Sequence, residues 1–255
     1  YAFAGGDNAH LGLFLLAGFL ITAASNALNQ IIEVDTDKLM DRTADRPLPA
    51  GRMQMTEALI AAGLMGISGV VLMWLVFNPL SALLGALSLL SYSFLYTPIK
   101  KLSPIAVFVG AFPGAIPPVI GWAAATGAFS EFALVLFAIQ FMWQFPHFWA
   151  IAWVAFDDYR KAGFHLLPTI SGKTRHSAFH ILIYTIVLLP VSLIPFITGY
   201  TGNVSAVIIM LAGIFFLYQA IQLYKMCDVQ AAKRLMFGSF LYLPVVFIAL
   251  FIDRL

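Results

Sequence analysis

Eight long apolar segments dominate the sequence, with polar stretches between them. They lie near residues 11–32, 57–77, 80–97, 104–125, 132–155, 178–199, 204–224 and 236–252. Each is close to the roughly 20 residues that an α-helix needs to cross the hydrocarbon core of a bilayer. The regular alternation of a β-barrel strand is absent, and a chain in lipid must be either helical or a closed barrel. The segments therefore predict an all-α polytopic transmembrane helix bundle.

The basic residues test this count independently, because cytoplasmic loops carry most of the Lys and Arg in membrane proteins. Of the 14 Lys and Arg residues, all but Arg254 fall in the first, third, fifth and seventh connections. The connections near residues 78, 126 and 200 contain none. We therefore expect the odd-numbered connections on the cytoplasmic side, and both ends of the chain on the opposite side.

The composition leaves no room for a sizeable soluble domain. Hydrophobic residues make up 61% and charged residues 10% of the chain, and the mean hydropathy is +0.91, whereas a soluble protein carries about 25% charged residues. Residues 1–255 are predicted to form a single transmembrane domain, with polar cytoplasmic loops at 33–56 and 156–177 capping its cavity. A net charge of +2 argues against nucleic-acid binding, and the single cysteine, Cys227, excludes a disulfide framework.

The densest polar pattern continues the first apolar segment. Asn29, Glu33, Asp37 and Asp41 recur every four residues, so on a continuing helix they would share one face. Carboxylates stacked in this way repel one another unless a cation neutralises them, and oxygen donors suit Mg²⁺, which also takes phosphate oxygens. The sequence therefore predicts a magnesium site at this point.

The alternative is a solvated loop in which nearby basic residues balance the acids; these are Lys38, Arg42 and Arg46. The position of Asn29 and Glu33 directly after an apolar segment favours a site. An acid near the bilayer centre costs about 2.5–3.5 kcal/mol, and intramembrane acids usually serve a function.

A second acidic pair, Asp157 and Asp158, follows the fifth segment and would supply a second metal-binding locus. Adjacent acids point in different directions on a helix, so at most one of them is expected to bind the same ion directly. Between the two clusters, Lys100 and Lys101 lie where their ammonium groups would hold a diphosphate. The alternative reading of the two lysines is that they only follow the rule that cytoplasmic loops are basic.

Two apolar segments contain unusual residues. Pro113, Pro117 and Pro118 fall within one segment, which predicts a kinked, broken helix with freed carbonyls that lines a cavity. Trp143 and His147 lie among large aromatic residues in the next segment. His147 is interpreted either as a packing histidine that donates to a carbonyl freed by proline, or as a contact to a flat, conjugated substrate.

These residues resemble the UbiA superfamily of intramembrane prenyltransferases. The first aspartate-rich motif matches Asn29-x-x-x-Glu33-x-x-x-Asp37 followed by Arg42-Thr43-x-x-Arg46-Pro47-Leu48. The likeness continues, in order, through Asn78-Pro79-Leu80, Tyr96-x-x-x-Lys100, Pro117-Pro118-Val119-Ile120-Gly121-Trp122, Trp143-Gln144-Phe145-Pro146-His147 and Asp158-Tyr159-x-x-Ala162-Gly163 to Leu167-Pro168. It covers essentially the whole chain. The resemblance implies nine helices around a central cavity, so a helix upstream of residue 11 is expected in addition to the eight visible segments.

The branch of the superfamily that is most similar uses haem as its acceptor. The resemblance therefore implies transfer of a farnesyl group from farnesyl diphosphate to a vinyl group of haem B, with Mg²⁺ as cofactor. It implies Mg²⁺ and catalytic roles for Asn29, Glu33, Asp37, Asp157 and Asp158, and diphosphate-binding roles for Arg42, Tyr96, Lys100 and Lys161. Trp143 and His147 are the candidates for acceptor binding.

Two alternative functions remain at this point. The nearer is transfer of a prenyl group to another aromatic ring or to a chlorin. The more distant is a cation-coupled transporter, which would place its acids near the bilayer midplane and not at the ends of the segments. The expected location is the cytoplasmic membrane of a bacterium, with the mitochondrial inner membrane as the alternative, because residues 1–10 resemble no signal or transit peptide. Association with other haem-biosynthesis or oxidase-assembly membrane proteins is a further expectation.

Overall fold

The computed structural model describes residues 1–255, and all of its long elements are helices. Eight helical segments are long and apolar enough to cross a membrane, which confirms the predicted count and the all-α class. They are α1 (Asn8–Ile32), α3 (Met55–Val76), α4 (Pro79–Leu90) continued to Ile99, α6 (Ala106–Thr126), α7 (Glu131–Val154), α9 (Arg175–Ile197), α10 (Asn203–Met226) and α11 (Val229–Ile252). The chain is a multi-pass integral membrane protein.

The helices group into two compact units, which are described separately. Unit 1 comprises residues 1–133 and 157–164, and unit 2 comprises residues 134–156 and 165–255. Unit 1 therefore holds α1, α3, α4 and α6, and unit 2 holds α9, α10, α11 and most of α7. The short elements of unit 1 are η1 (Ala2–Ala4), α2 (Val34–Asp37), η2 (Ser91–Tyr96), α5 (Thr97–Ile99) and all but the first residue of α8 (Phe156–Lys161).

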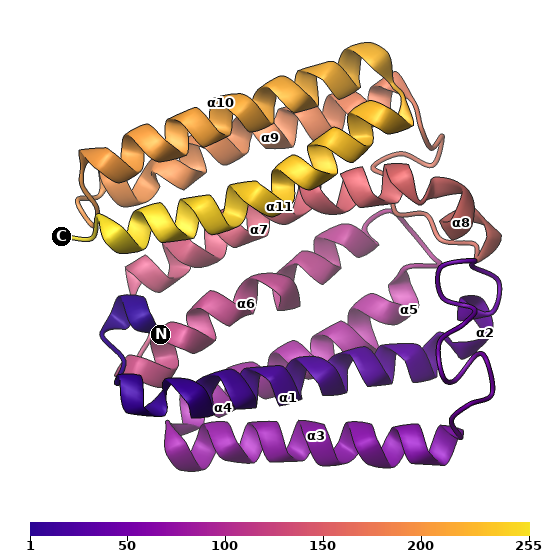
Figure 1. Ribbon diagram of the computed structural model, residues 1–255, viewed down its shortest axis with the longest axis horizontal. Coiled ribbons are helices and arrows are strands. Elements are labelled where there is room, and N and C mark those ends of the chain that lie inside the picture. The colour runs from indigo at the N-terminus through magenta and orange to yellow at the C-terminus, as the bar shows by residue number, and fades with distance from the viewer. The chain divides into compact units, whose positions relative to one another are not determined.

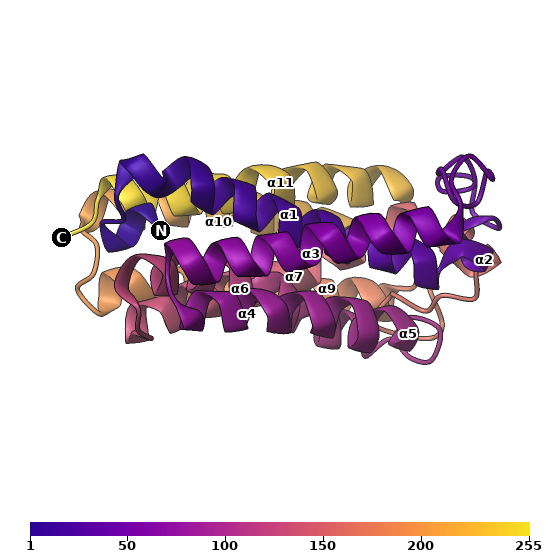
Figure 2. The ribbon, with the colours of Figure 1, turned by 90° about the horizontal axis from the view of Figure 1, so that it is seen from below.

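In unit 1, α1 packs against α3, α3 against α4, and α4 against α6 (Figures 1 and 2). Small residues permit this approach, as they commonly do between transmembrane helices. A Cβ atom on Gly69 of α3 would lie 2.8 Å from Ile21 Cγ1 and 3.1 Å from the Ala17 carbonyl oxygen of α1. The α1–α3 contact therefore depends on the missing side chain of Gly69.

The three prolines of α6 do not break it, and the prediction of a broken helix is wrong. The helix is continuous over Ala106–Thr126. Because Pro117 has no N–H to donate, the carbonyl of Pro113, one turn earlier, loses its usual partner. The hydroxyl of Ser88 on α4 donates to that carbonyl at 3.1 Å. A neighbouring helix thus supplies the missing hydrogen bond within the membrane.

The third span contains a π-helical turn, η2, that the sequence analysis did not predict. Pro98 lacks the N–H that would continue an α-helix past this point. Both the amide and the hydroxyl of Thr97 donate to the carbonyl of Tyr92, five residues earlier, the hydroxyl at 3.0 Å. π-Helical turns often occur at functional sites, and this one leads directly into Thr97 and Lys100.

In unit 2, α10 packs against both α9 and α11, and the three helices run alongside one another (Figure 1). The hydroxyl of Tyr242 on α11 donates to that of Ser192 on α9 at 2.9 Å, and both residues are buried. The last helix begins at Val229, seven residues before the predicted start. Its N-terminus is capped by Asp228, whose carboxylate accepts from the Ala231 amide at 2.7 Å, which is a favoured helix start.

Candidate active site

The first acidic motif lies at the end of α1 in unit 1, and three of its members are buried. Asn29, Glu33 and Asp37 are 7%, 5% and 0% exposed. The amide of Asn29 donates to Glu33 Oε2 at 2.9 Å and to the hydroxyl of Thr97 at 3.1 Å. The hydrogen bond to Thr97 ties α1 to the segment that follows the π-helical turn, so two membrane spans build the site together.

Glu33 is paired with a buried lysine. Lys100 Nζ donates to Glu33 Oε2 at 3.2 Å and lies 3.1 Å from Oε1, the latter contact without hydrogen-bond geometry. The ammonium also lies 4.6 Å from the centre of the Tyr96 ring, within the range of a cation–π contact. Burial lowers the pKa of Lys100, and the neighbouring carboxylate of Glu33 opposes that shift.

Asp37 is paired with an arginine from the loop that follows. Arg46 Nη1 donates to Asp37 Oδ2 at 2.7 Å, while the Asp37 side chain is fully buried and that of Arg46 is 29% exposed. The hydroxyl of Thr43 donates to the backbone carbonyl of Asp37 at 2.9 Å. The alternative of a solvated, salt-bridged loop therefore describes Asp35, Asp41 and Asp45, which are exposed and paired with basic residues. It does not describe Glu33 and Asp37, which are paired but buried.

Two carboxylate oxygens in this cluster still lack a hydrogen-bond donor. Both Asp37 Oδ1 and Glu33 Oε1 are fully shielded and accept no hydrogen bond. Buried oxygens of this kind are normally satisfied, and Mg²⁺ prefers such ligands. The cluster holds only two carboxylates, and no group of three or more His, Cys, Asp and Glu residues with metal-binding geometry is present. The residues fit a magnesium ion that takes its remaining ligands from a diphosphate and water.

Asp41 does not share this face, so the prediction that four side chains point the same way is wrong. The helix stops at Ile32, α2 adds one turn that ends at Asp37, and Asp41 follows in a turn. Its side chain is 87% exposed and accepts from Lys161 Nζ at 2.6 Å. Figure 2 shows the compact loop that follows α2.

The second acidic pair is used in a different way. Asp158 in α8 accepts hydrogen bonds from the backbone amides of Asp41 at 2.8 Å and Arg42 at 3.3 Å. Lys161 Nζ lies 3.6 Å from Asp158 Oδ1, and the Arg42 guanidinium lies 5.7 Å from the Tyr159 ring centre. Partial burial acts to raise the pKa of Asp158, but the two amides and Lys161 outweigh it and hold the pKa below its ordinary value. Asp158 thus ties α8 to the loop after the first motif.

Two adjoining cavities lie between α1, α4 and α6 in unit 1. One of about 360 Å³ and one of about 200 Å³ share Ile21, Thr22, Ser88 and Pro117 in their walls. The smaller cavity reaches Asn26 and Tyr92, and Asn26 is less than one helical turn from Asn29. These cavities confirm that α6 lines a cavity. They form a mostly apolar passage next to the buried polar cluster, with Thr22, Ser25, Asn26 and Ser88 in the wall of its smaller part.

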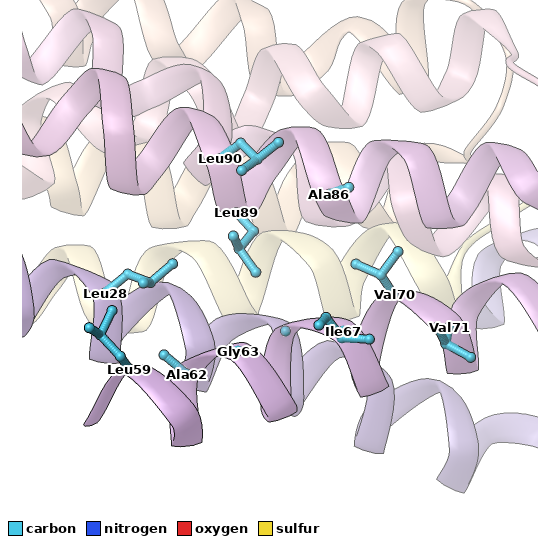
Figure 3. A pocket seen from close by; sticks show the side chains of 11 residues that line it. Leu28, Leu59, Ala62, Gly63, Ile67, Val70, Val71, Ala86, Leu89 and Leu90 are labelled. Carbon is cyan, nitrogen blue, oxygen red and sulfur yellow. The ribbon is translucent and has the colours of Figure 1, made fainter. Parts of the chain in front are cut away.

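A separate groove of about 460 Å³ lies between α1, α3 and α4 (Figure 3). Every residue that lines it is apolar, including Leu28, Ile67 and Leu89. The groove offers no group for acid–base or metal chemistry. The polar cluster and this groove are therefore different features of unit 1.

The predicted acceptor residues lie in unit 2. The Trp143 and His147 rings on α7 stack with centroids 4.2 Å apart. Trp143 Nε1 donates to the carbonyl of Ser239 on α11 at 2.9 Å, and His147 Nδ1 lies 2.7 Å from the Ser239 hydroxyl. His147 thus pairs with a hydroxyl, whereas the packing alternative expected a carbonyl freed by Pro146.

Three residues that complete these arrangements were missing from the predicted site residues, namely Arg46, Thr97 and Ser239. The quoted Arg46-Pro47-Leu48 motif was a signal for Arg46, and the Thr97-Pro98 pair was a signal for an irregular helix end. Ser239 lies 92 residues from His147 in the sequence, and no local pattern marks it.

Comparison with known proteins identifies close relatives of this chain. It is 53% identical over 250 residues to a protoheme IX farnesyltransferase of Cytophaga hutchinsonii, covering 98% of this chain and 87% of the relative. It is 49% identical over 247 residues to a protoheme IX farnesyltransferase of Christiangramia forsetii, covering 95% of this chain and 81% of that relative. Both relatives are bacterial.

Solved structures share the fold at low sequence identity. A digeranylgeranylglyceryl phosphate synthase superposes with a TM-score of 0.78 at 20% identity, covering 97% of this chain and 86% of that one. A UbiA homologue from Archaeoglobus fulgidus bound to DMAPP and Mg²⁺ superposes with a TM-score of 0.68 at 14% identity, covering 97% of this chain and 89% of the homologue. The sequence model of the UbiA prenyltransferase family matches residues 1–244. On its helices, its buried acidic motif and these matches, the chain belongs to the UbiA prenyltransferase family.

Proposed function

We propose that this protein transfers a farnesyl group from farnesyl diphosphate to a vinyl group of haem B. The observation that carries the proposal is a cluster of buried, cation-paired carboxylates, two of whose oxygens accept no hydrogen bond, next to a mostly apolar passage between α1, α4 and α6. The relative of 53% identity, named for this reaction, supports haem as the acceptor.

The reaction breaks the allylic C–O bond of farnesyl diphosphate, and the electron pair leaves with the diphosphate. The electron pair of the haem vinyl group forms the new C–C bond to the farnesyl cation. Water then adds to the resulting cation and releases a proton, which leaves a hydroxyethylfarnesyl substituent. When bound, Mg²⁺ supplies positive charge that makes diphosphate a better leaving group.

Asn29, Glu33 and Asp37 are the residues that would hold Mg²⁺. Lys100 and Arg46 neutralise the two carboxylates, and their flexible side chains are suited to contact diphosphate oxygens. Such positive groups stabilise the charge that develops on the leaving group. The ring of Tyr96 beside Lys100 fixes the position from which that ammonium acts.

In this proposal, the mostly apolar passage shields the farnesyl cation from water. An allylic cation in water is captured before it reaches its acceptor, so a site of this kind must exclude solvent. The walls of the passage include Phe14 and Tyr92, and aromatic faces attract a cation. We place the farnesyl chain along this passage.

In this proposal, residues around the second acidic pair complete the binding site for the diphosphate group of the substrate. Arg42 and Lys161 add positive charge, and Asp158 holds the loop that carries Arg42 through its two amide contacts. Because both oxygens of Asp158 face amides, Asp157 is the carboxylate of this pair that we propose as the metal ligand. Polar loops 33–56 and 156–177 would then cover the site at the cytoplasmic face of a bacterial membrane.

Trp143 and His147 are proposed to contact the porphyrin. Their stacked rings present a flat aromatic surface that suits a conjugated macrocycle, and stacked aromatic pairs contribute about 0.5–1.5 kcal/mol beyond the area they bury.

The experiment is incubation of the purified full chain with haem B, farnesyl diphosphate and Mg²⁺. We expect haem O and diphosphate in equal amounts, detected by chromatography and a phosphate assay. A chelator should stop the reaction, and added Mg²⁺ should restore it. Diphosphate release without a haem product, or a product only from a quinone precursor or chlorin supplied in competition, would reject haem as the acceptor.

A further inference from the structure

The imidazole of His147 is held in one orientation. The Trp143 ring stacks on it with a 4.2 Å centroid distance and an 18° interplanar angle. Phe148 and Phe240 contact it edge to face, each at 5.0 Å, and the Ser239 hydroxyl lies 2.7 Å from Nδ1. The residue is 6% exposed. Three aromatic neighbours and a hydrogen bond thus hold the ring in place.

The hydrogen bonds of Ser239 determine which ring nitrogen carries the proton. Its hydroxyl donates to the carbonyl of Met236 at 2.5 Å. A hydroxyl has a single proton, so toward His147 it acts only as an acceptor. With the hydroxyl proton assigned to the Met236 carbonyl, Nδ1 of His147 is the protonated nitrogen, and in the neutral ring Nε2 carries the lone pair.

The Nε2 lone pair of His147 accepts no hydrogen bond from any donor in the protein. A histidine whose Nδ1–H is held by an oxygen and whose Nε2 is left open has the usual arrangement of a metal-binding histidine, in which the outer partner sets the tautomer and the ring orientation. Histidine is also a common axial ligand of haem iron.

We propose that His147 Nε2 binds the iron of the acceptor haem as an axial ligand, and that Ser239 is the positioning residue that prepares it. This inference rests on the proposed function, because it assumes an iron porphyrin as acceptor. The lone pair of Nε2 forms the coordinate bond and no electron is transferred. An axial bond sets the porphyrin plane across the Fe–N direction, so a rigid imidazole would limit the orientations in which the vinyl groups are presented.

The test compares an iron porphyrin with the same ring lacking a metal. The purified full chain is titrated with ferric haem B and with metal-free protoporphyrin IX, and binding is followed by the Soret band and by tryptophan quenching. We expect the wild-type protein to bind haem with a Soret band typical of histidine ligation, and at least about 100-fold more tightly than protoporphyrin IX.

The variants separate coordination from packing. His147→Ala should lower haem affinity to that of protoporphyrin IX, and added imidazole should restore the Soret band. Ser239→Ala should weaken haem binding by about 10-fold, the scale typical of partners that orient metal ligands, and leave protoporphyrin IX binding unchanged. Ser239→Thr keeps the hydroxyl and should retain wild-type affinity. His176→Ala, at an exposed histidine on α9, is the matched control and should leave the affinities for haem and for protoporphyrin IX unchanged.

The outcomes distinguish the inference from the function. If the wild-type protein makes haem O but His147→Ala leaves the Soret band and the preference for iron unchanged, axial ligation is wrong and farnesyl transfer stands. If His147 ligates haem but no haem O forms, the proposed function fails and the ligand assignment stands. If Ser239→Ala weakens both porphyrins equally, Ser239 acts in packing only and its positioning role is rejected.

Discussion

The two acidic clusters of this chain hold their carboxylates differently. At the end of α1, Glu33 and Asp37 are buried and pair with side-chain cations, and each has one oxygen that accepts no hydrogen bond. In α8, Asp158 uses both oxygens on the backbone amides of Asp41 and Arg42. In the proposed function the first cluster binds the ligand, whereas Asp158 holds a loop in place through its backbone amides.

The largest effect is expected at Asp37. Asp37→Ala removes a proposed metal ligand, and a bound metal contributes several kcal/mol of charge stabilisation. We therefore expect kcat to fall by about 1000-fold. The fold should survive, because Arg46 is partly exposed and can turn to solvent. The rate of haem O formation measures kcat, and thermal unfolding in detergent measures the stability of the fold.

The matched control for this prediction is Asp35→Ala. Asp35 lies in the same short helix, but its side chain is 88% exposed and pairs only with Lys38. It should keep wild-type activity. Equal losses in both variants would show that any acid in this helix matters, and would remove the distinction between buried and exposed carboxylates.

A smaller effect is expected from Lys100→Met. A hydrogen bond from a charged group contributes about 2 kcal/mol, so the KM for farnesyl diphosphate should rise by about 30-fold. Lys101→Met, at the exposed neighbour, serves as the control. A drop in kcat with unchanged KM would mean that Lys100 acts on the leaving group only in the transition state and does not bind the substrate.

Asp158 offers the direct comparison between fixing a loop and binding a metal. Asp158→Ala removes both amide contacts, at a cost of about 1–2 kcal/mol, and should lower kcat/KM by about 10-fold. Asp158→Asn keeps a carbonyl acceptor and should therefore retain most of the wild-type kcat/KM. The Mg²⁺ concentration for half-maximal activity should stay unchanged in both. A marked rise in that concentration in Asp158→Asn would identify Asp158 as a metal ligand.

The smallest effect concerns pH. The folded-state pKa of Asp158 lies below its ordinary value of 3.8, so its contribution is complete above pH 3.8 and is lost as the pH falls through the folded-state pKa. The pKa of Lys161 is raised from 10.5, chiefly by its hydrogen bond to Asp41, so its contribution is complete below pH 10.5 and is lost at higher pH. Hydrogen exchange in residues 38–54 should therefore show constant protection between pH 5 and 8. A change in this protection between pH 5 and 8 would contradict the assignment of the loop contacts to Asp158 and Lys161.

Much of the fold was predictable because hydropathy is a local property. A run of about 20 apolar residues has few stable alternatives to a spanning helix, and all eight were found. The errors occurred where one helix depends on another. The three prolines of α6 suggested a break, but Ser88 of α4 satisfies the freed carbonyl of Pro113. The α11 start was placed late because Lys233 and Arg234, in the second turn of the helix, resemble a loop.

The site was only partly predictable for the same reason. The four-residue spacing brought Asn29 and Glu33 into contact, as expected for neighbours on one helix face, and Asp37 follows them as a third buried residue. It failed at Asp41, because the helix ends first. A spacing rule carries no information on where a helix stops when no strong stop signal is present.

The sequence by itself determined the eight spans and the burial of an acidic motif at the end of the first. Hydrophobic burial and helical periodicity act over neighbouring residues, so the sequence displays them directly. Only the tertiary structure decided that Lys100 pairs with Glu33, that Asp158 accepts from the loop amides, and that the Ser239 hydroxyl lies against His147 Nδ1. These pairs are separated by 67, 117 and 92 residues, and only the packing of the helices within each unit brings them within hydrogen-bonding distance.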